Sequence, residues 1–402
     1  MSEEWERVRL GEVTTQVKDV HPVAAGKEYP LLGVRLYAEG PFLRETVTNQ
    51  TSKATRFHRV SKGQFIYNRM FAWKGAFGVI PDALDGCFVS NEFPVFDCDE
   101  SAVLADYLAL WFQQPSVWDE VGGVSTGTTA SRNRWKESQF EQYQIAIPPL
   151  PVQRRIVDLM AHLDNHLANL QTERDAADAL LSEHRDRAMR FGIPTRAGDA
   201  FEVLIGRQRS PKRAMGPSMT PYLRAANIKD GHLDMSDVKE MDFDADEREK
   251  FGLSEGDVLV SEGSGSADAV GASARWSSEI GGPICFQNTL LRYRAIESVS
   301  VPSFVYHWCR WAHESGAFRE TATGTNILHI GSTRAVEMTV NLPSVSKQEE
   351  TCEFLDSLET SITSLEREIE GVGNLRKQLL GALLTGSSAV SSTYDVLLSG
   401  VA

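Results

Sequence analysis

The segment Ile147-Pro-Pro-Leu-Pro-Val-Gln-Arg-Arg-Ile-Val157 marks the place where a short apolar strand ends and a long helix begins. Its prolines stop the strand, because proline has no amide hydrogen to donate to a sheet. A helix is expected from about Pro151 to Arg190, since apolar residues recur there at the two core positions of a heptad through four repeats. These residues are Ile156, Met160, Leu163, Leu167, Leu170, Ala177, Leu181 and Ala188.

A second long helix follows a second proline stop, Val340-Asn-Leu-Pro343. Four heptads with charged flanks are typical of a coiled coil. The alternative, a single amphipathic helix packed on its own domain, remains open, although both helices are long for one domain face. The core positions of the second helix hold Leu355, Leu358, Ile362, Leu365, Ile369, Val372, Leu379 and Leu383.

Two features break the heptad pattern. Arg174 and Arg376 occupy core positions, one in each helix. Gly371 and Gly373 interrupt the second helix, where each glycine costs about 1 kcal/mol relative to alanine. We interpret these two glycines as a kink or a point of close approach.

The chain contains an internal duplication with an offset of 193 to 197 residues. Such a long period indicates two similar domains rather than the short units of a solenoid. Short alternating apolar runs such as Val258-Leu-Val260 predict strands in the globular parts. The paired segments are Val60–Tyr67 with Leu253–Val260, Trp111 with Trp308, Thr126–Thr128 with Thr323–Thr325, and Gln153 with Gln348.

Connectivity fixes how the two helices would pair. The first helix delivers the chain to the second domain, so a second helix packed against it must run back, antiparallel. We therefore predict an α+β fold of two similar mixed α/β domains, separated by a long antiparallel two-helix coiled coil with pseudo-two-fold symmetry. A helix of about 38 residues spans about 57 Å. The predicted boundaries are 1–149 and 191–343 for the domains, 150–190 and 344–386 for the helices, and 387–402 for a C-terminal tail.

Charge is unevenly distributed along the chain. The formal net charge of −14 is unfavourable for binding nucleic acid. However, residues 44–74 hold seven basic residues and one acid, and residues 205–229 hold six basic residues and no acid. Residues 230–262 are strongly acidic. The two basic stretches are candidates for phosphate contacts, and an ordinary solvated surface remains the alternative.

Other patterns are absent from the sequence. The polar start Met1-Ser-Glu-Glu-Trp-Glu-Arg7 does not resemble a secretory signal peptide. No apolar run reaches the roughly 20 residues of a membrane span, so a cytoplasmic protein is expected. Five dispersed cysteines without a CxxC pair predict buried, reduced thiols and no metal site.

Several motifs mark the start, the junctions and the end of the two repeats. The most specific is the junction Ile147–Val157, from which the second junction departs by reading Leu-Pro-Ser-Val. The others are Trp5-x4-Leu10-Gly-Glu-Val13, Pro221–Ile228, Gly256–Val260, Leu375–Leu380 and Leu383–Gly386. With this order and duplication, the chain resembles the specificity subunits of type I restriction-modification systems over nearly its whole length.

The resemblance implies that each domain is a target-recognition domain that reads one half of a split, asymmetric DNA sequence. The helices would act as a ruler that sets the unread gap. Two methyltransferase subunits and two restriction (nuclease-translocase) subunits would join the chain. S-adenosylmethionine, ATP and magnesium would bind to those partners, and this chain would have neither catalytic residues nor a cofactor.

Sequence reading needs side chains that hydrogen-bond to base edges, while lysine and arginine hold phosphates. We expect such residues on loops that follow strands. The candidates in the first domain are Asn68, Arg69, Trp73, Lys74, Thr128, Ser131, Arg132, Asn133 and Arg134. The candidates in the second domain are Arg207, Arg209, Lys212, Ser264 and Asn326. The residues expected to pair the helices and to support partner binding are Ile156, Leu163, Leu170, Leu358, Ile362 and Leu365.

Three alternative functions stay open. An enzyme that carries its own reader is disfavoured, because the sequence has neither the Asn/Asp-Pro-Pro-Tyr/Phe motif of amino-methyltransferases nor a clear carboxylate–lysine cluster of a nuclease. A non-enzymatic coiled-coil adaptor, whose globular parts bind protein, would suit the acidic net charge. A specificity factor of a related phage-defence system would have the same architecture.

Overall fold

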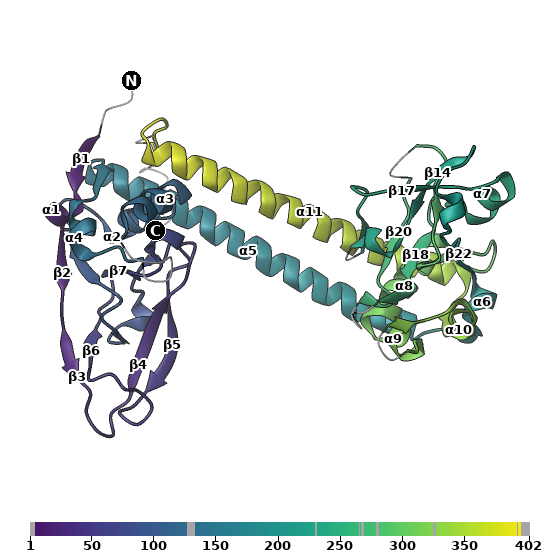
Figure 1. The fold of residues 1–402 in the computed structure, drawn as a ribbon, viewed down its shortest axis with the longest axis horizontal. Coiled ribbons are helices and arrows are strands. Elements are labelled where there is room, and N and C mark those ends of the chain that lie inside the picture. The colour runs from purple at the N-terminus through teal and green to yellow at the C-terminus, as the bar shows by residue number, and fades with distance from the viewer. Residues whose placement is uncertain are drawn as a thin grey trace. The chain divides into compact units, whose positions relative to one another are not determined.

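The chain divides into two compact units. Unit 1 consists of Met1–Asn169 and Glu368–Ala402, and unit 2 consists of Leu170–Arg367. Each unit contains strands, short helices and segments of two long helices (Figure 1). A computed structural model describes residues 5–126, 133–229, 231–264, 266, 269–278, 281–324, 327–391 and 393–394.

Unit 1 is built on two β-sheets and a short strand pair. Its strands are β1 (Glu6–Arg9), β2 (Thr14–Val17), β3 (Val20–Pro22), β4 (Tyr29–Val34), β5 (Pro41–Val47), β6 (Arg56–Arg59), β7 (Phe65–Tyr67), β8 (Phe77–Val79), β9 (Phe88–Val89), β10 (Val95–Cys98) and β11 (Gln144–Ile147). One sheet is antiparallel with the order β2-β10-β7-β8. The other has the order β3-β6-β9-β4-β5, in which β4 and β9 are parallel. The pair β1-β11 leads into the first long helix.

Short helices cover the sheets of unit 1. They are α1 (Leu10–Val13), α2 (Ala105–Trp111), α3 (Pro115–Val124) and α4 (Glu137–Gln142), with 3-10 turns η1 (Ala72–Lys74) and η2 (Asp82–Leu84). The core between them is rich in aromatic rings, because Phe77 and Phe112 stack at 4.3 Å and Trp135 is fully buried beside them. This packing holds the loop after β7, which carries the first group of candidate residues.

Unit 2 has a four-stranded antiparallel sheet of order β13-β22-β18-β20 and a three-stranded sheet of order β17-β14-β21. The strands of these two sheets are β13 (Phe201–Ile205), β14 (Met219–Leu223), β17 (Lys239–Asp242), β18 (Val258–Ser261), β20 (Ser273–Arg275), β21 (Cys285–Phe286) and β22 (Leu290–Ala295). Short pairs join β12 (Ile193–Arg196) to β24 (Thr339–Leu342), β15 (Ile228–Lys229) to β16 (His232–Leu233), and β19 (Gly263–Ser264) to β23 (Leu328–His329).

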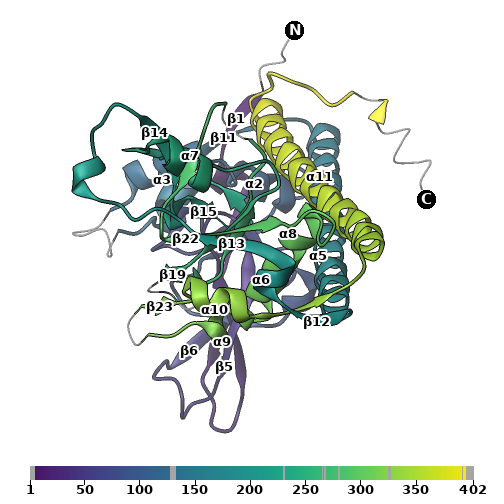
Figure 2. The same cartoon turned by 90° about the vertical axis from the view of Figure 1, so that its right-hand side faces the viewer.

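Apart from its segments of the two long helices, unit 2 contains short helices and the longer helix α8. They are α6 (Ala197–Ala200), α7 (Ala245–Phe251), α8 (Pro302–Glu314), α9 (Ala317–Thr321) and α10 (Ser332–Glu337), with 3-10 turns η4 (Pro211–Arg213) and η5 (Ala225–Asn227). Figure 2 shows α6 and α10 side by side at one end of this unit. Trp308 of α8 lies fully buried against Phe201, whereas its sequence counterpart Trp111 is only partly buried.

The strand order of the four-stranded sheet is the same in the two units. In both, a parallel pair also occurs in the second sheet, β4 with β9 and β14 with β21. The strand predicted at Val258–Val260 is confirmed as part of β18, and the strands predicted before the two proline stops are β11 and β24. The second sheets differ, since unit 1 adds β3 and β6.

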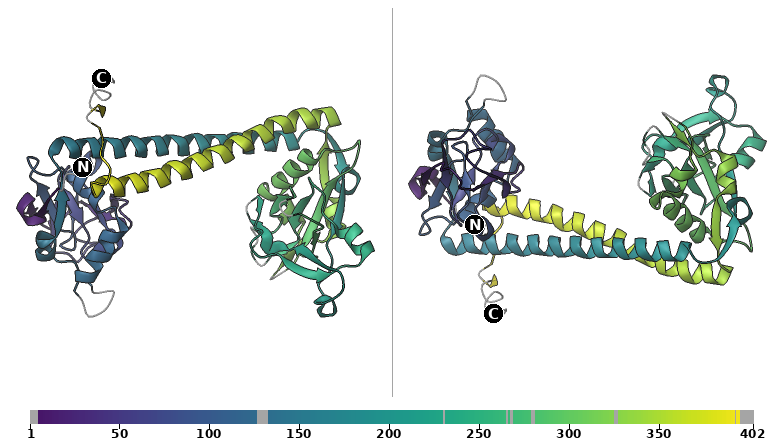
Figure 3. Two further views of the ribbon diagram at one scale, coloured as in Figure 1. Left: turned by 90° about the horizontal axis from the view of Figure 1, so that it is seen from above. Right: turned by 90° about the horizontal axis from the view of Figure 1, so that it is seen from below.

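Both long helices that the heptads predict are present. They are α5 (Leu150–Met189) and α11 (Val345–Leu384), and within each unit their segments lie side by side (Figure 3). In unit 1, Ile156 and Met160 share a core with Leu380 and Leu383. Among the described helices, none combines the length and the apolar content that a membrane span requires.

The helix segments run antiparallel within each unit. In unit 1, Asp164 of α5 binds Arg376 of α11, and Ile156 lies in the core that holds Leu383. In unit 2, Arg185 of α5 binds Glu359 of α11, whereas Arg174, earlier on α5, lies near Glu366, later on α11. Of the six residues expected to pair the helices, Ile156, Leu170 and Ile362 are buried, and Leu163, Leu358 and Leu365 are partly buried.

The interpretation of Gly371 and Gly373 as a point of close approach is wrong. A Cβ atom built on either glycine would meet no atom within 4 Å. The helix α11 continues without a break through both positions. The local propensity cost is therefore outweighed by the packing of the rest of a 40-residue helix.

A buried glutamine attaches the start of each long helix to the domain before it. The Gln153 amide donates to the carbonyls of Pro148 and Ala102, both at 2.8 Å, and its oxygen accepts the Leu104 amide at 2.9 Å. Gln348 makes the equivalent three bonds in unit 2, at 3.0 Å each, with Pro343, Val299 and Val301. Both glutamines are 0% exposed.

Gln348→Leu is expected to lower the free energy of unfolding by about 3 kcal/mol, because buried backbone groups would lose their partners. Gln153→Leu should have an effect of the same size. Urea unfolding of the full chain measures the shift, with Gln378→Leu at an exposed position of α11 as the control. Shifts no larger than that of the control would contradict the role assigned to these two side chains.

Candidate nucleic-acid interface

The candidate loop after β7 is held by internal bonds. Asn68 is 7% exposed, and its Oδ1 accepts the Met70 amide at 2.9 Å, so this side chain caps the turn rather than facing solvent. Trp73 Nε1 donates to the Met70 carbonyl at 3.0 Å. Lys74 places its ammonium 4.8 Å from the centre of the Trp73 ring. The Oδ1 atom of Asn68 is thus occupied by the turn, and Trp73 and Lys74 are partly exposed; all three remain predicted contacts.

The second candidate segment of unit 1 is only partly described. Thr128, Ser131 and Arg132 lie outside the described residues. Asn133 is partly exposed. Arg134 forms a two-pronged ion pair with Glu92, with both N–O distances at 3.1 Å, so its guanidinium is largely used within the unit.

A basic cleft of about 330 Å³, here called the first cleft, lies in unit 1. Lys18, Arg56 and Arg69 supply its positive groups, His58 lies among them, and Glu137 is the acid in its lining. Glu137 forms an ion pair with Arg69, so its carboxylate does not neutralise the other basic side chains of the cleft. Lys18 and Arg56 are exposed, and within the described part of the chain neither has an ion pair.

Two pKa shifts record the electrostatics of the first cleft. Burial, followed by the charges of Arg56, Arg69 and Lys18, lowers the pKa of His58 below its usual 6.5. Burial alone would raise the pKa of Glu137, but its hydrogen bond from Arg69 contributes to a net lowering. The charges of Arg56, Arg69 and Lys18 thus add to the effect of burial at His58, and such a gathering of positive charge is expected of an anion-binding surface.

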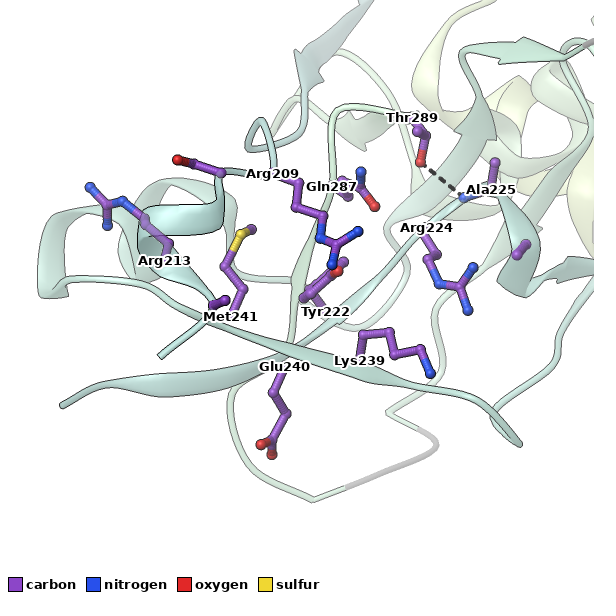
Figure 4. Close-up of a pocket in the computed structure, with 13 residues that line it drawn as sticks. Arg209, Arg213, Tyr222, Arg224, Ala225, Lys239, Glu240, Met241, Gln287 and Thr289 are labelled. Atoms are coloured by element: carbon purple, nitrogen blue, oxygen red, sulfur yellow. Dashed lines mark hydrogen bonds between the residues drawn. The ribbon is translucent and has the colours of Figure 1, made fainter. Parts of the chain in front are cut away.

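A larger basic cleft of about 520 Å³, the second cleft, lies in unit 2. Arg209, Arg224 and Lys239 lie around the ring of Tyr222, and Glu240 points away from them (Figure 4). Tyr222 is 3% exposed and forms the floor. A cleft lined by cations suits a polyanion such as the phosphate backbone of DNA.

Most cations of the second cleft have acidic partners. Arg213 binds Glu247 at 2.5 Å, while Arg224 and Lys239 share Asp237. Arg209 is exposed, and no ion pair joins it to any described residue. Lys212 is also exposed, whereas Arg207 binds Glu247 at 2.6 Å. Arg209 and Lys212 are thus the predicted residues best placed for phosphates.

Two further candidates in unit 2 are Asn326 and Ser264. Asn326 lies outside the described residues. Ser264 belongs to β19, and its backbone pairs with Leu328.

The two clefts lie at the same place in the shared strand order. Lys18 follows β2, and Asn91 lies between β9 and β10 in the first cleft. Arg209 follows β13, and Gln287 lies between β21 and β22 in the second. Each cleft thus joins cations, which can bind phosphates, to an amide, which can read a base edge.

Sequence reasoning found part of each cleft. It selected Arg69 and Arg209, and the basic stretches contained Arg56 and Arg224 without marking them as site residues. It missed Lys18, His58 and Lys239, because no local pattern distinguishes these residues from other polar surface positions. Only the pairing of distant strands places them together.

Comparison with known proteins confirms the resemblance drawn from the sequence. Residues 2–177 match the family described as type I restriction modification DNA specificity domain. The type I restriction enzyme StySPI specificity subunit of Salmonella potsdam is 24% identical over 178 residues, 44% of this chain and 37% of that subunit. The EcoKI specificity subunit of Escherichia coli K12 is 19% identical over 310 residues, 71% of this chain and 66% of that subunit. The chain thus spans 37% and 66% of the lengths of these curated relatives.

A solved structure shares the fold of the chain. The HsdS subunit from Thermoanaerobacter tengcongensis aligns with a TM-score of 0.52 over 96% of this chain and 97% of that one, at 16% sequence identity. At this identity the likeness concerns the fold alone, a mixed arrangement of helices and strands.

Proposed function

We propose that this chain, which matches the type I restriction modification DNA specificity domain over residues 2–177 and is similar to two type I specificity subunits, is the DNA-reading, non-catalytic subunit of such a complex. One observation carries the proposal: a basic cleft that includes an amide side chain occurs at the same topological place in both units. Two equivalent clefts suit a DNA target read in two halves. Their linings differ in residue type and position, so the two halves would differ in sequence.

We further propose that α5 and α11 form one antiparallel coiled coil that sets the gap between the two halves. Each helix has 40 residues, which corresponds to about 60 Å. The antiparallel contacts within each unit support this arrangement, and a pseudo-two-fold axis would relate the two recognition domains. The domains would be 1–149 and 191–343, the spacer helices 150–190 and 344–386, and the tail 387–402.

The proposed partners are double-stranded DNA, two methyltransferase subunits and the restriction subunits. S-adenosylmethionine, ATP and magnesium would be bound by those subunits and not by this chain. Exposed apolar side chains on the long helices offer them contact area, namely Leu180 of α5 and Phe354 and Leu375 of α11. The complex would act in the cytoplasm, where its DNA is.

Mapping of methylated bases in host DNA tests the proposed function. Cells that express the chain with its methyltransferase should carry a two-part methylated motif, and cells that lack the chain should lose it. Gel-shift assays of the assembled complex should then show a preference for that motif over scrambled DNA. An adaptor would leave the methylation pattern unchanged, and a related defence factor would direct a different modification, so either result would overturn the proposal.

His58 predicts how DNA binding by unit 1 depends on pH. Its pKa is lowered in the free protein, so the ring is mostly neutral at pH 7 and gains its proton below pH 6.5. A nearby phosphate would favour the charged ring, so affinity for the target should rise as the pH falls from 7.5 to 5.5. His58→Gln should reduce that rise, which titrations at fixed salt would measure. An identical pH profile for the variant would remove His58 from the interface.

A further inference from the structure

Helix α8 faces the long helices of unit 2 with polar side chains. Ser303, Tyr306, His307, Trp311 and Glu314 are spaced by three, four or one residues and share one side of the helix. Their partners are Asp356 and Glu359 on α11 and Asp186 and Arg185 on α5. Residues 191–343, here called the recognition part of unit 2, are therefore attached to the long helices through hydrogen bonds and ion pairs as well as through apolar packing.

Arg185 lies at the centre of this attachment and joins three helices. Its side chain is only 3% exposed. Nη1 donates to both carboxylate oxygens of Glu314 on α8, at 2.8 and 2.9 Å, and Nη2 donates to Glu359 on α11 at 2.7 Å. Glu359 also accepts the Tyr306 hydroxyl at 3.1 Å. We call Arg185, Glu314 and Glu359 the Arg185 cluster.

A neighbouring group of possible metal ligands belongs to the same network. His307, Asp356 and Glu359 offer ligand atoms within 4.8 Å of one another. Their carboxylates already accept hydrogen bonds from protein donors: Asp356 from Ser303 at 2.8 Å, and Glu359 from Arg185. These bonds extend the attachment of α8 to α11.

Unit 1 contains a related arrangement at the corresponding place. Arg376 of α11, 15% exposed, binds Asp164 of α5 at 2.8 Å and Gln113, just after α2, at 3.0 Å. Asp164 and Glu359 are 195 residues apart, which is the offset of the sequence duplication. In both units an arginine therefore joins the two long helices to the recognition part. The unit 2 version is more buried and uses two carboxylates instead of one.

Stability alone does not explain a buried arginine between helices. An apolar side chain of similar size often gives equal or greater stability, since burying charges requires desolvation. The planar guanidinium adds fixed geometry, because its two Nη groups point in set directions, here Nη1 to Glu314 and Nη2 to Glu359. The Arg185 cluster therefore defines the angle between α8 and the long helices more narrowly than apolar contacts would.

A fixed angle matters for reading a target with a gap. Each base pair added to the gap moves one half-site by about 3.4 Å and rotates it by about a tenth of a turn. A loosely attached recognition domain could follow that rotation, whereas a rigidly attached one could not. Discrimination between gap lengths therefore depends on how each domain is attached to its spacer.

We propose that Arg185 is a positioning residue that sets the tolerance of the complex for gap length, without taking part in the reading of bases. This inference rests on the proposed function. It assigns to the Arg185 cluster a role in specificity that is separate from the two clefts. Loss of the cluster should let the complex methylate targets with a wider range of gap lengths. The base sequence read in each half-site should stay the same.

The test uses cells that express the full chain with its methyltransferase and carry plasmids with the native gap or a gap one base pair shorter or longer. The readout is methylation of the altered-gap targets divided by methylation of the native target. This ratio should rise about tenfold in Arg185→Gln, the size typical of such couplings, and less in Arg185→Lys. Glu314→Gln removes one carboxylate at a partly exposed site and serves where Arg185→Gln does not accumulate.

Arg187→Gln is the control, since Arg187 lies two residues away on α5 and is 76% exposed. Its ratio should equal that of the native chain. An unchanged ratio in Arg185→Gln, Arg185→Lys and Glu314→Gln, or an equal loss of methylation at all three gaps, would overturn the inference. Absence of any two-part methylated motif with the native chain would instead overturn the proposed function.

Discussion

Ile156→Asp is expected to lower the free energy of unfolding by about 4 kcal/mol and to release the methyltransferase partners. Ile156 is 1% exposed and shares the core of unit 1 with Met160, Leu380 and Leu383. A carboxylate there would have no partner, so it must either take up a proton or open the contact between α5 and α11. Opening this contact would disrupt the surface on which the partners are proposed to dock.

Ala161→Asp is the matched control for this prediction. Ala161 is exposed on the same helix, five residues further on, so the substitution adds the same charge without burying it. Urea unfolding and co-purification with the methyltransferase measure the two effects. The control should change stability by less than about 1 kcal/mol and keep its partners. Equal destabilisation by both variants would contradict the packing of Ile156 between the helices.

Removing Arg209 and Lys212 together is expected to weaken binding to the DNA target about a hundredfold at moderate salt. Both side chains are exposed at the second cleft or next to it, and Arg209 has no acidic partner in the described part of the chain. Each lost phosphate contact should also reduce the slope of log affinity against log salt by about 0.9. The double alanine variant should therefore show a slope smaller by about 2.

Arg187→Ala with Arg190→Ala removes the same charge from exposed positions at the end of α5 and is the control. Its salt slope should match that of the native chain if the effect is local to the cleft. Titrations of the assembled complex at several salt concentrations give both quantities. A loss of affinity with an unchanged slope would show that Arg209 and Lys212 do not contact phosphates.

The long helices were the most predictable part of the fold. A heptad is a local pattern, and its four repeats in α5 and α11 leave few other ways to bury Ile156 or Leu355. One break in the pattern was informative, because Arg376 at a core position binds Asp164 and Gln113. Arg185 was not marked, since nothing in the sequence around it shows that it is buried.

The clefts were only partly predictable, for a physical reason. Lys18 and Asn91 meet because β2 pairs with β10, and Arg209 and Gln287 meet because β13 pairs with β22. Such contacts depend on pairings between strands far apart in the chain, which alternation alone does not specify. The environment of Asn68 was not predictable either, because a polar side chain in a loop can hydrogen-bond to the backbone of its own turn.

Replacing residues 191–343 with the corresponding domain of another specificity subunit, and then mapping methylated bases, tests the central claim most directly. If each unit reads its own half of the target, one half of the methylated motif should change and the other half should stay as it was. A motif in which both halves change, or in which neither does, would contradict the account.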